Sequence, residues 1–232
     1  MQKILFIPGY LCTDALFQYQ LDHLSDGISG TVADIPPLTT MEDIARVLWR
    51  KHPDPCIICG LSMGGIIAME MVRQRPDLVQ GLVLLDTNAK SEGAEVSAAR
   101  QKLVQEGKLI GPGKMSLKRL LPKLVHPDRT EDEGLRAIIY QMAEECGVEK
   151  LGNHARALET RPDYSDPLRE INCPTLIAYG AQDLLCPADR HDHIKSLILN
   201  AQYEVFANCG HLSPLEKPLE VSQLLDEWFL RC

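Results

Sequence analysis

The sequence predicts an α/β fold with a doubly wound, mostly parallel sheet of about six strands and an inserted helical lid. Two observations support this prediction. Short apolar runs alternate with stretches of helical periodicity in residues 1–86 and again in residues 173–232. Residues 87–172 contain several helical stretches and no strand-like run. Right-handed crossovers between parallel strands should place helices on both faces of the sheet.

The composition is that of an ordinary globular protein. The chain has 232 residues and is 45% hydrophobic, enough for one sizeable core. Its net charge of −8 disfavours a nucleic-acid partner, which requires a basic face. No window approaches the roughly 18 apolar residues of a membrane span, and no signal peptide is recognisable. We therefore expect a cytoplasmic protein, with a homodimer left open.

Neither a disulfide framework nor a cofactor site is expected. The eight cysteines are scattered without paired spacing and should be reduced thiols. Cys56 and Cys59 form a Cys-x-x-Cys pair, but both lie in an apolar run where small side chains pack well. The chain has no glycine-rich nucleotide fingerprint, no phosphate loop and no clustered metal ligands. We expect neither a metal nor a cofactor.

The core elements follow in chain order. Apolar runs predict strands over residues 3–7, 30–34, 56–60, 81–86, 174–180 and 202–206. Helical periodicity predicts helices over residues 14–24, 41–51, 66–73, 188–199 and 217–230. The second strand contains Gly30 and Thr31, which suits a sheet edge.

The lid is expected to be helical throughout. Helices are predicted over residues 92–106, 116–125, 131–146 and 148–159, separated by glycine and proline. A crossover between parallel strands needs only one helix, so this segment exceeds what the sheet requires. The alternative is that these helices pack on the sheet like the others.

A glycine-rich turn joins the third strand to its helix. In Gly60-Leu-Ser-Met-Gly64, an apolar strand leads to a serine and then to a helix, the context of a nucleophile elbow. The glycines let the strand and helix pass close together, and the backbone N–H of Met63 points to where an oxyanion would form. The alternative is a turn whose serine only caps the helix.

Four stretches of the chain resemble the α/β-hydrolase fold superfamily. They are Phe6-Ile-Pro-Gly-Tyr10, Gly60-Leu-Ser-Met-Gly64, Gly180-Ala-Gln-Asp183 and Asn208-Cys-Gly-His211. The resemblance covers nearly the whole length and is to small, lidded serine hydrolases of the esterase type. It implies that Ser62 is the nucleophile, Asp183 the acid and His211 the base. Each follows a strand, and the carboxyl ends of parallel strands share one edge, so the three can converge.

Other residues compete for some of these roles. Asp86 ends the fourth strand, where a few superfamily members carry the acid. His191 and His193 lie about 200° apart on a helix, which disfavours shared metal binding. His154 lies in the lid, where it is expected to be exposed, although a substrate contact remains open.

The second oxyanion donor is implied by the same resemblance. It should be the backbone N–H of Tyr10, beside that of Met63. Most relatives have His-Gly before this position, whereas this chain has Pro8-Gly9. The departure leaves the N–H of Tyr10 intact and removes the hydrogen bonds of a histidine.

Arginines near the end of the lid have two interpretations. Arg161 and Asp163 are expected to pair and anchor the lid to the core. Alternatively, Arg161 or Arg156 binds a carboxylate of the substrate.

The residues favour a serine hydrolase that cleaves a small carboxylic ester through an acyl-enzyme on Ser62. A serine nucleophile argues against epoxide and haloalkane hydrolysis, which use aspartate on this fold. One alternative is a carbon–carbon bond hydrolase or lyase that acts on an acidic metabolite with the same triad. Another is a ligand-sensing homologue that signals through its lid.

Overall fold

The computed structural model describes residues 2–231. The strands are β1 (Gln2–Ile7), β2 (Ile28–Val32), β3 (Cys56–Leu61), β4 (Val79–Leu85), β5 (Thr175–Gly180) and β6 (Gln202–Phe206). The α-helices are α1 (Gln18–Asp22), α2 (Met41–Lys51), α3 (Met63–Gln74), α4 (Ala94–Ile110), α5 (Pro112–Met115), α6 (Leu121–Leu124), α7 (Glu133–Glu159), α8 (Ser165–Arg169), α9 (Ala188–Leu197), α10 (Ser213–Glu216) and α11 (Pro218–Phe229). Shorter turns are η1 (Asp14–Phe17), η2 (Pro76–Leu78), η3 (Ser116–Leu120) and η4 (Pro127–Arg129).

The six strands form one parallel sheet. Their order is β2-β1-β3-β4-β5-β6, and every neighbouring pair is parallel. The apolar runs of β3 and β5 are buried along their whole length, as expected for strands covered on both faces. The half-exposed strand β2 lies at an edge. The predicted six-stranded sheet and its edge strand are therefore confirmed.

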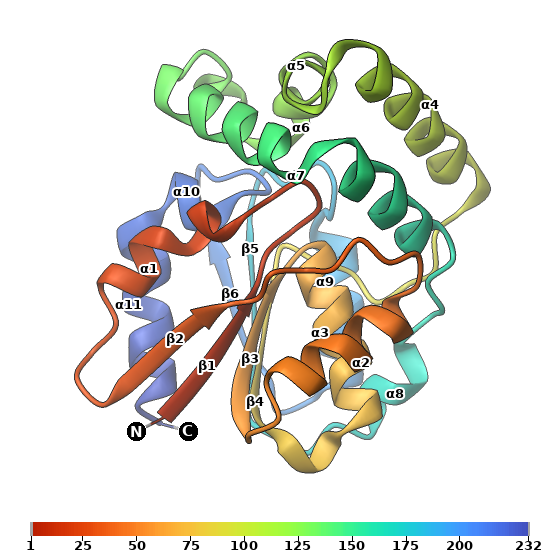
Figure 1. Ribbon diagram of the computed structural model, residues 1–232. Coiled ribbons are helices and arrows are strands. Elements are labelled where there is room, and N and C mark those ends of the chain that lie inside the picture. Colours follow the sequence, from red (N-terminus) through yellow and green to blue (C-terminus); the bar gives the residue numbers. More distant parts are fainter. Residues whose placement is uncertain (1, 232) are drawn as a thin grey trace.

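Helices cover both faces of the sheet (Figure 1). Helices α2, α3, α8 and α9 share one apolar cluster with residues of the sheet, which includes Leu48, Ile67 and Ile194. Helices α1 and α11 lie on the other face, where Leu21 of α1 packs against a second cluster that includes Leu225 of α11. The arrangement is doubly wound, as the alternation of strands and helices predicts.

Some element boundaries differ from the sequence prediction. The first helix is only one turn of 3-10 helix followed by α1, which ends at Asp22. The lid helices predicted over residues 131–146 and 148–159 are joined in α7, which kinks at Gly147. The φ of 68° at this residue is easily adopted by glycine.

A helical cover, made of residues 94–159, lies across the carboxyl ends of the strands (Figure 1). Its α7 is tied to the loop after β2 by polar contacts. The amide of Asn153 donates to the carbonyl oxygen of Pro37 at 2.7 Å, and Lys150 pairs with Asp34 at 2.8 Å. Helix α8 follows the cover but packs against α3 and α9 of the core. The cover therefore closes over the edge at which active sites of parallel sheets are found.

No helix within residues 2–231 is long and apolar enough to cross a membrane. Seven cysteines within residues 2–231 carry free thiols. The eighth, Cys232, lies outside the described residues.

Candidate active site

Ser62 lies at a sharp turn between β3 and α3. Its backbone has φ 55° and ψ −115°, a conformation that non-glycine residues rarely adopt. Close packing makes the turn possible. A Cβ atom on Gly60 would lie 2.3 Å from the carbonyl oxygen of Gly64, and one on Gly64 would lie 1.9 Å from that of Ile7. The turn thus has the geometry of a nucleophile elbow, with the serine held in a strained conformation.

Strained backbone is concentrated at this edge of the sheet. The four non-glycine residues with positive φ within residues 2–231 are Leu11, Ser62, Asp86 and Asn208. Each lies in a loop that follows a strand at its carboxyl end. Such conformations persist only where the surroundings impose them, and they cluster at functional sites.

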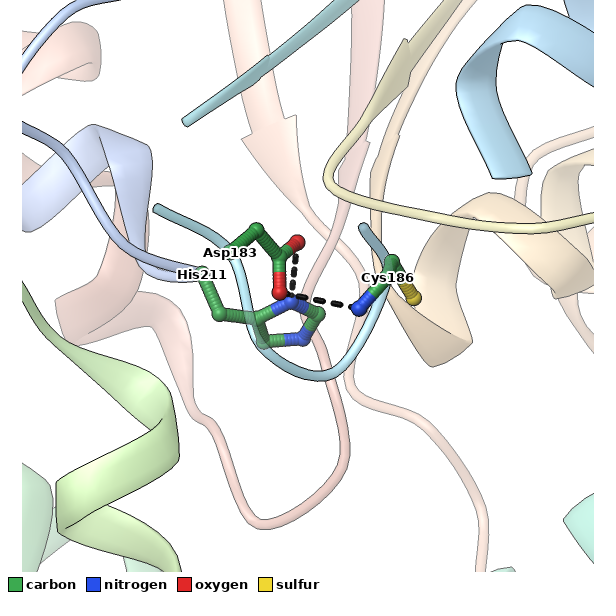
Figure 2. A group of neighbouring side chains, drawn as sticks. All are labelled: Asp183, Cys186 and His211. Carbon is green, nitrogen blue, oxygen red and sulfur yellow. Dashed lines mark hydrogen bonds and ion pairs between the residues drawn. The ribbon is translucent and has the colours of Figure 1, made fainter. Parts of the chain in front are cut away.

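Ser62, His211 and Asp183 form a continuous hydrogen-bonded chain. Nε2 of His211 lies 2.8 Å from Oγ of Ser62, and Nδ1 lies 2.7 Å from Oδ2 of Asp183. The other oxygen of Asp183 accepts the backbone N–H groups of Leu185 and Cys186 at 2.8 and 2.9 Å. Figure 2 shows the carboxylate between the His211 ring and the N–H of Cys186. The structure thus brings together the three residues that the family resemblance implied.

The pKa of His211 reflects two opposing effects. Burial alone would lower it, but the negative charge of Asp183 and its hydrogen bond outweigh burial and raise the pKa above its ordinary value. The imidazole is therefore a better proton acceptor than a free histidine.

Asp86 is held in a different way from Asp183. It is fully buried, and its oxygens bond to the backbone N–H of Gly180 and the hydroxyl of Ser213. Burial, reinforced by the negative charge of Asp183, raises its pKa well above the usual range. Asp86 makes no hydrogen bond to His211 and is therefore a poor candidate for the acid.

Two backbone N–H groups are the predicted oxyanion donors. Those of Tyr10 and Met63 donate to no backbone oxygen within the part of the chain that the structure describes. Met63 begins α3, where no intrahelical acceptor is available. Two hydrogen bonds hold the loop that carries Tyr10, in which no histidine takes part. The N–H of Cys12 donates to the carbonyl oxygen of Gly9, and the Tyr10 hydroxyl donates to the carbonyl oxygen of Leu151. Free donors at this position suit an oxyanion.

Cys186 lies near the same carboxylate. Its Sγ and ligand atoms of Asp183 and His211 all lie within 4.8 Å of one another, a spacing that could hold a metal ion. Burial raises the pKa of the Cys186 thiol, which disfavours the thiolate that metals prefer. Both oxygens of Asp183 are already hydrogen-bonded. These groups suit the hydrogen-bonded chain better than a metal site.

A cavity of about 580 Å³ opens above Ser62 and His211, a volume typical of small-molecule sites. Its walls come from the loop after β1, the loop after β4 and the helical cover. The cover contributes Leu103, Leu120 and Leu124, and Leu158 also lines the space. The wall is mixed, with apolar side chains between several charged ones.

A second layer of residues supports the turn at Ser62. The hydroxyl of Thr87 donates to the Ser62 carbonyl at 2.7 Å, and the Thr87 N–H donates to Nε2 of His191 at 3.0 Å. The His191 ring stacks on Tyr179 with centroids 4.2 Å apart. Sequence reasoning did not identify Thr87 or this role of His191. The only feature of the sequence that could have indicated them is position, because Thr87 comes just after a strand whose carboxyl end lies at the sheet edge that carries Ser62.

Two sequence expectations about the lid are wrong. His154 is not exposed but only 2% accessible, and its Nε2 lies 3.0 Å from the carbonyl oxygen of Pro36. Arg161 does not pair with Asp163. It pairs with Glu92 at 2.8 Å, whereas Asp163 accepts the N–H of Ser165. Both side chains are directed by contacts with segments distant in sequence.

The structure also separates the two arginines, Arg161 and Arg156, that were candidates for binding a carboxylate of the substrate. Arg161 lines the cavity, whereas Arg156 pairs with Glu159 and lies outside it. Sequence reasoning missed Glu92 and Arg100, which accompany Arg161 in the wall. No local pattern links residues so far apart.

Comparisons with known proteins agree with this architecture. The alpha/beta hydrolase family model matches residues 4–224. A pimeloyl-[acyl-carrier protein] methyl ester esterase of Aromatoleum aromaticum is 26% identical over 213 residues, which cover 87% of this chain and 83% of that protein. A 2-hydroxy-6-oxononadienedioate/2-hydroxy-6-oxononatrienedioate hydrolase of Paraburkholderia phymatum is 29% identical over 175 residues, 72% of this chain and 60% of that protein.

A solved structure of similar shape is also an esterase. The thermophilic esterase of Thermogutta terrifontis superposes with a TM-score of 0.89 at 26% identity, covering 100% of this chain and 90% of that chain. The family match spans nearly the whole length, and the relatives are hydrolases. The chain therefore belongs to the alpha/beta hydrolase family and is a hydrolase.

Proposed function

We propose that this hydrolase is a serine esterase that cleaves a small carboxylic ester through an acyl-enzyme on Ser62. The hydrogen-bonded chain from Asp183 through His211 to the Ser62 hydroxyl, at the base of a cavity, carries the proposal. The similarity to one esterase in sequence and to another in structure supports it.

The first half of the reaction forms the acyl-enzyme. Oγ of Ser62 attacks the ester carbonyl while Nε2 of His211 takes its proton, and Asp183 stabilises the resulting imidazolium. The carbonyl oxygen becomes an oxyanion that accepts the N–H groups of Tyr10 and Met63. When this intermediate collapses, the bond to the alcohol oxygen breaks, and His211 returns the proton so that a neutral alcohol leaves.

The second half regenerates the enzyme by the same steps. His211 takes a proton from a water molecule, whose oxygen attacks the acyl carbon. The tetrahedral intermediate collapses with cleavage of its bond to Ser62, and the serine oxygen regains the proton from His211. The products are an alcohol and a carboxylic acid.

We also propose that residues 87–172 act as a lid, with residues 1–86 and 173–232 as the hydrolase core. The cover places apolar side chains such as Leu124 above the cavity. A closed site limits water access and strengthens electrostatic stabilisation of the oxyanion.

The first test combines covalent labelling with turnover. A fluorophosphonate probe should label Ser62, as located by peptide mapping, and p-nitrophenyl esters from acetate to decanoate should reveal a chain-length optimum. Ser62→Ala should abolish labelling and lower kcat by roughly 10⁴-fold or more, with an unchanged unfolding curve. Labelling without turnover of any ester would reject the esterase assignment.

A second candidate is hydrolysis of a carbon–carbon bond in a carboxylate-bearing diketone by the same residues. The basic side chains Arg100 and Arg161 in the cavity wall favour it, since such a substrate is anionic. Turnover of such a diketone, together with poor turnover of simple esters, would select this candidate.

A further inference from the structure

The charge of the cavity is opposite to that of the whole chain. The protein carries a net charge of −8. Among the described residues that line the cavity, Glu92 nevertheless carries the single carboxylate, and six side chains are basic, namely Arg100, Lys118, Arg119, Lys123, Arg161 and Arg190. Such a concentration of positive charge in a partly enclosed space attracts anions.

The innermost basic group is a buried cluster of Glu92, Arg100 and Arg161. The Glu92 side chain is 1% exposed and pairs with Arg100 at 2.6 Å and with Arg161 at 2.8 Å. Arg161 is itself 7% exposed. Burial would raise the pKa of Glu92, but the two guanidinium groups outweigh burial and lower it. One ionised carboxylate therefore balances two cations, and the cluster keeps one positive charge.

Both arginines are held rigidly and still have donors to offer. Nε of Arg161 donates to the carbonyl oxygen of Lys90, and its Nη1 donates to the carbonyl oxygen of Leu158 and to the carboxylate of Glu92. Nε and Nη2 of Arg100 both donate to the carboxylate of Glu92. Nη2 of Arg161 and Nη1 of Arg100 donate to no acceptor within residues 2–231. Both residues line the cavity.

The cluster and the proposed catalytic residues share one cavity. Ser62, His211, Arg100 and Arg161 all line the same space of about 580 Å³. The guanidinium carbon of Arg100 lies 5.6 Å from the centroid of the Tyr10 ring, which lines this space as well. A small substrate with its carbonyl at Ser62 can therefore extend through the cavity toward the arginines.

A second, outer group of basic residues lies at the opening. Lys118 and Arg119 share the single carboxylate of Glu106 and are at least half exposed. Lys123 forms no ion pair in the described chain. These exposed side chains can attract an anion, but solvent screens them more strongly than the buried cluster.

We propose that the Glu92–Arg100–Arg161 cluster binds a free carboxylate of the substrate, so that the enzyme prefers half-esters of short dicarboxylic acids to neutral esters. Planar guanidinium groups match the geometry of a carboxylate and form strong charge-assisted hydrogen bonds with it. The preference for half-esters rests on the proposed esterase function, whereas carboxylate binding does not.

A matched pair of substrates measures the preference. Monomethyl glutarate and methyl pentanoate have the same acyl length and leaving alcohol, and only the first carries a distal carboxylate. Wild-type protein should show the higher kcat/KM with monomethyl glutarate. Arg100→Gln should lower the ratio of the two kcat/KM values by roughly 10- to 100-fold, the value of a charged hydrogen bond. Arg100→Lys should restore part of it.

A substitution of opposite sign separates binding from structural damage. Glu92→Gln leaves two arginines unbalanced, so the ratio should rise, whereas a purely structural role predicts that both substitutions impair both substrates alike. Arg156→Gln, outside the cavity, is the control and should leave the ratio unchanged. A ratio that does not move in opposite directions in Arg100→Gln and Glu92→Gln overturns the proposal.

Calorimetry with the Ser62→Ala protein gives a readout that does not depend on turnover. Glutarate should bind more tightly than pentanoate, with weaker binding when Arg100→Gln is added and tighter binding when Glu92→Gln is added. If neither substitution changes the affinity for glutarate, the proposed carboxylate subsite is wrong and the esterase proposal stands. If Ser62 cannot be labelled, the esterase proposal fails and the calorimetry still decides the subsite.

Discussion

At the scale of single residues, the environment distinguishes two buried aspartates that follow neighbouring strands. Asp183 accepts two backbone N–H groups and lies 2.7 Å from the His211 ring. Asp86 receives only the Gly180 N–H and the Ser213 hydroxyl, and burial keeps its pKa well above the usual range. A carboxylate in contact with the imidazole can orient it and stabilise the imidazolium, and of the two only Asp183 makes that contact.

Substitution of each aspartate by asparagine tests this distinction. Asp183→Asn should lower kcat on an accepted ester by roughly 10⁴-fold, because the His211 tautomer and the imidazolium lose their support. Asp86→Asn should change kcat by less than about tenfold, since Asp86 makes no hydrogen bond to His211 and an amide keeps the shape of the side chain. Steady-state kinetics give the kcat of both variants and show which aspartate is the acid. If Asp86→Asn is the more severe, the proposed acid is the wrong one.

At the scale of elements, the helical cover and the loop of His211 are joined. The carbonyl oxygen of Leu124 accepts the N–H groups of both His211 and Leu212 at 3.0 Å. The Glu216 carboxylate accepts the N–H groups of His126 and Gly210, each at 2.7 Å. The position of the imidazole therefore depends on the cover as well as on the sheet.

The packing of α3 against β1 leads to a prediction about glycines. Gly64→Ala should destabilise the fold by roughly 3 kcal/mol or more, because a Cβ atom there would lie 1.9 Å from the Ile7 carbonyl oxygen. Gly152→Ala in α7 is the matched control, since its Cβ would meet nothing within 4 Å. Better helix propensity should stabilise this variant by up to about 1 kcal/mol. Urea unfolding of both measures the difference, and equal effects would contradict the close packing of the elbow.

At the scale of the whole molecule, buried histidines link stability to pH. Burial lowers the pKa of His191 from 6.5 to about 4. The unfolded chain therefore binds a proton on this residue at a pH where the folded chain does not. Its contribution to stability is complete above pH 6.5 and is lost as the pH falls toward 4. The loss amounts to roughly 3 kcal/mol at most. His211, with a raised pKa, acts in the opposite sense.

Comparison of variants isolates the contribution of His191. His191→Gln should have a lower free energy of unfolding at pH 7 but a shallower decline between pH 6.5 and 4 than the wild type. His23→Gln, at an exposed position, should follow the wild-type curve. Urea unfolding over this pH range provides the values. Parallel curves for wild type and His191→Gln would show that this histidine does not couple folding to protons.

The sequence by itself determined the alternation of strands and helices and the turn at Ser62, and its resemblance to the α/β-hydrolase superfamily implied Asp183 and His211. It could do so because burial on a sheet leaves a local apolar pattern, and because the carboxyl ends of parallel strands share one edge. The six-stranded sheet with β2 at its edge follows from the same rules.

Only the tertiary structure decided the surroundings of this edge. The pairing of Glu92 with Arg161, the burial of His154 and the basic character of the cavity depend on how the helical cover packs on the core. These contacts join segments far apart in the chain, and a helix shows in its sequence that it has an apolar face without showing which partner that face meets. The substrate preference that we propose therefore arises from long-range packing, whereas the arrangement of the proposed catalytic residues arises from local pattern and sheet geometry.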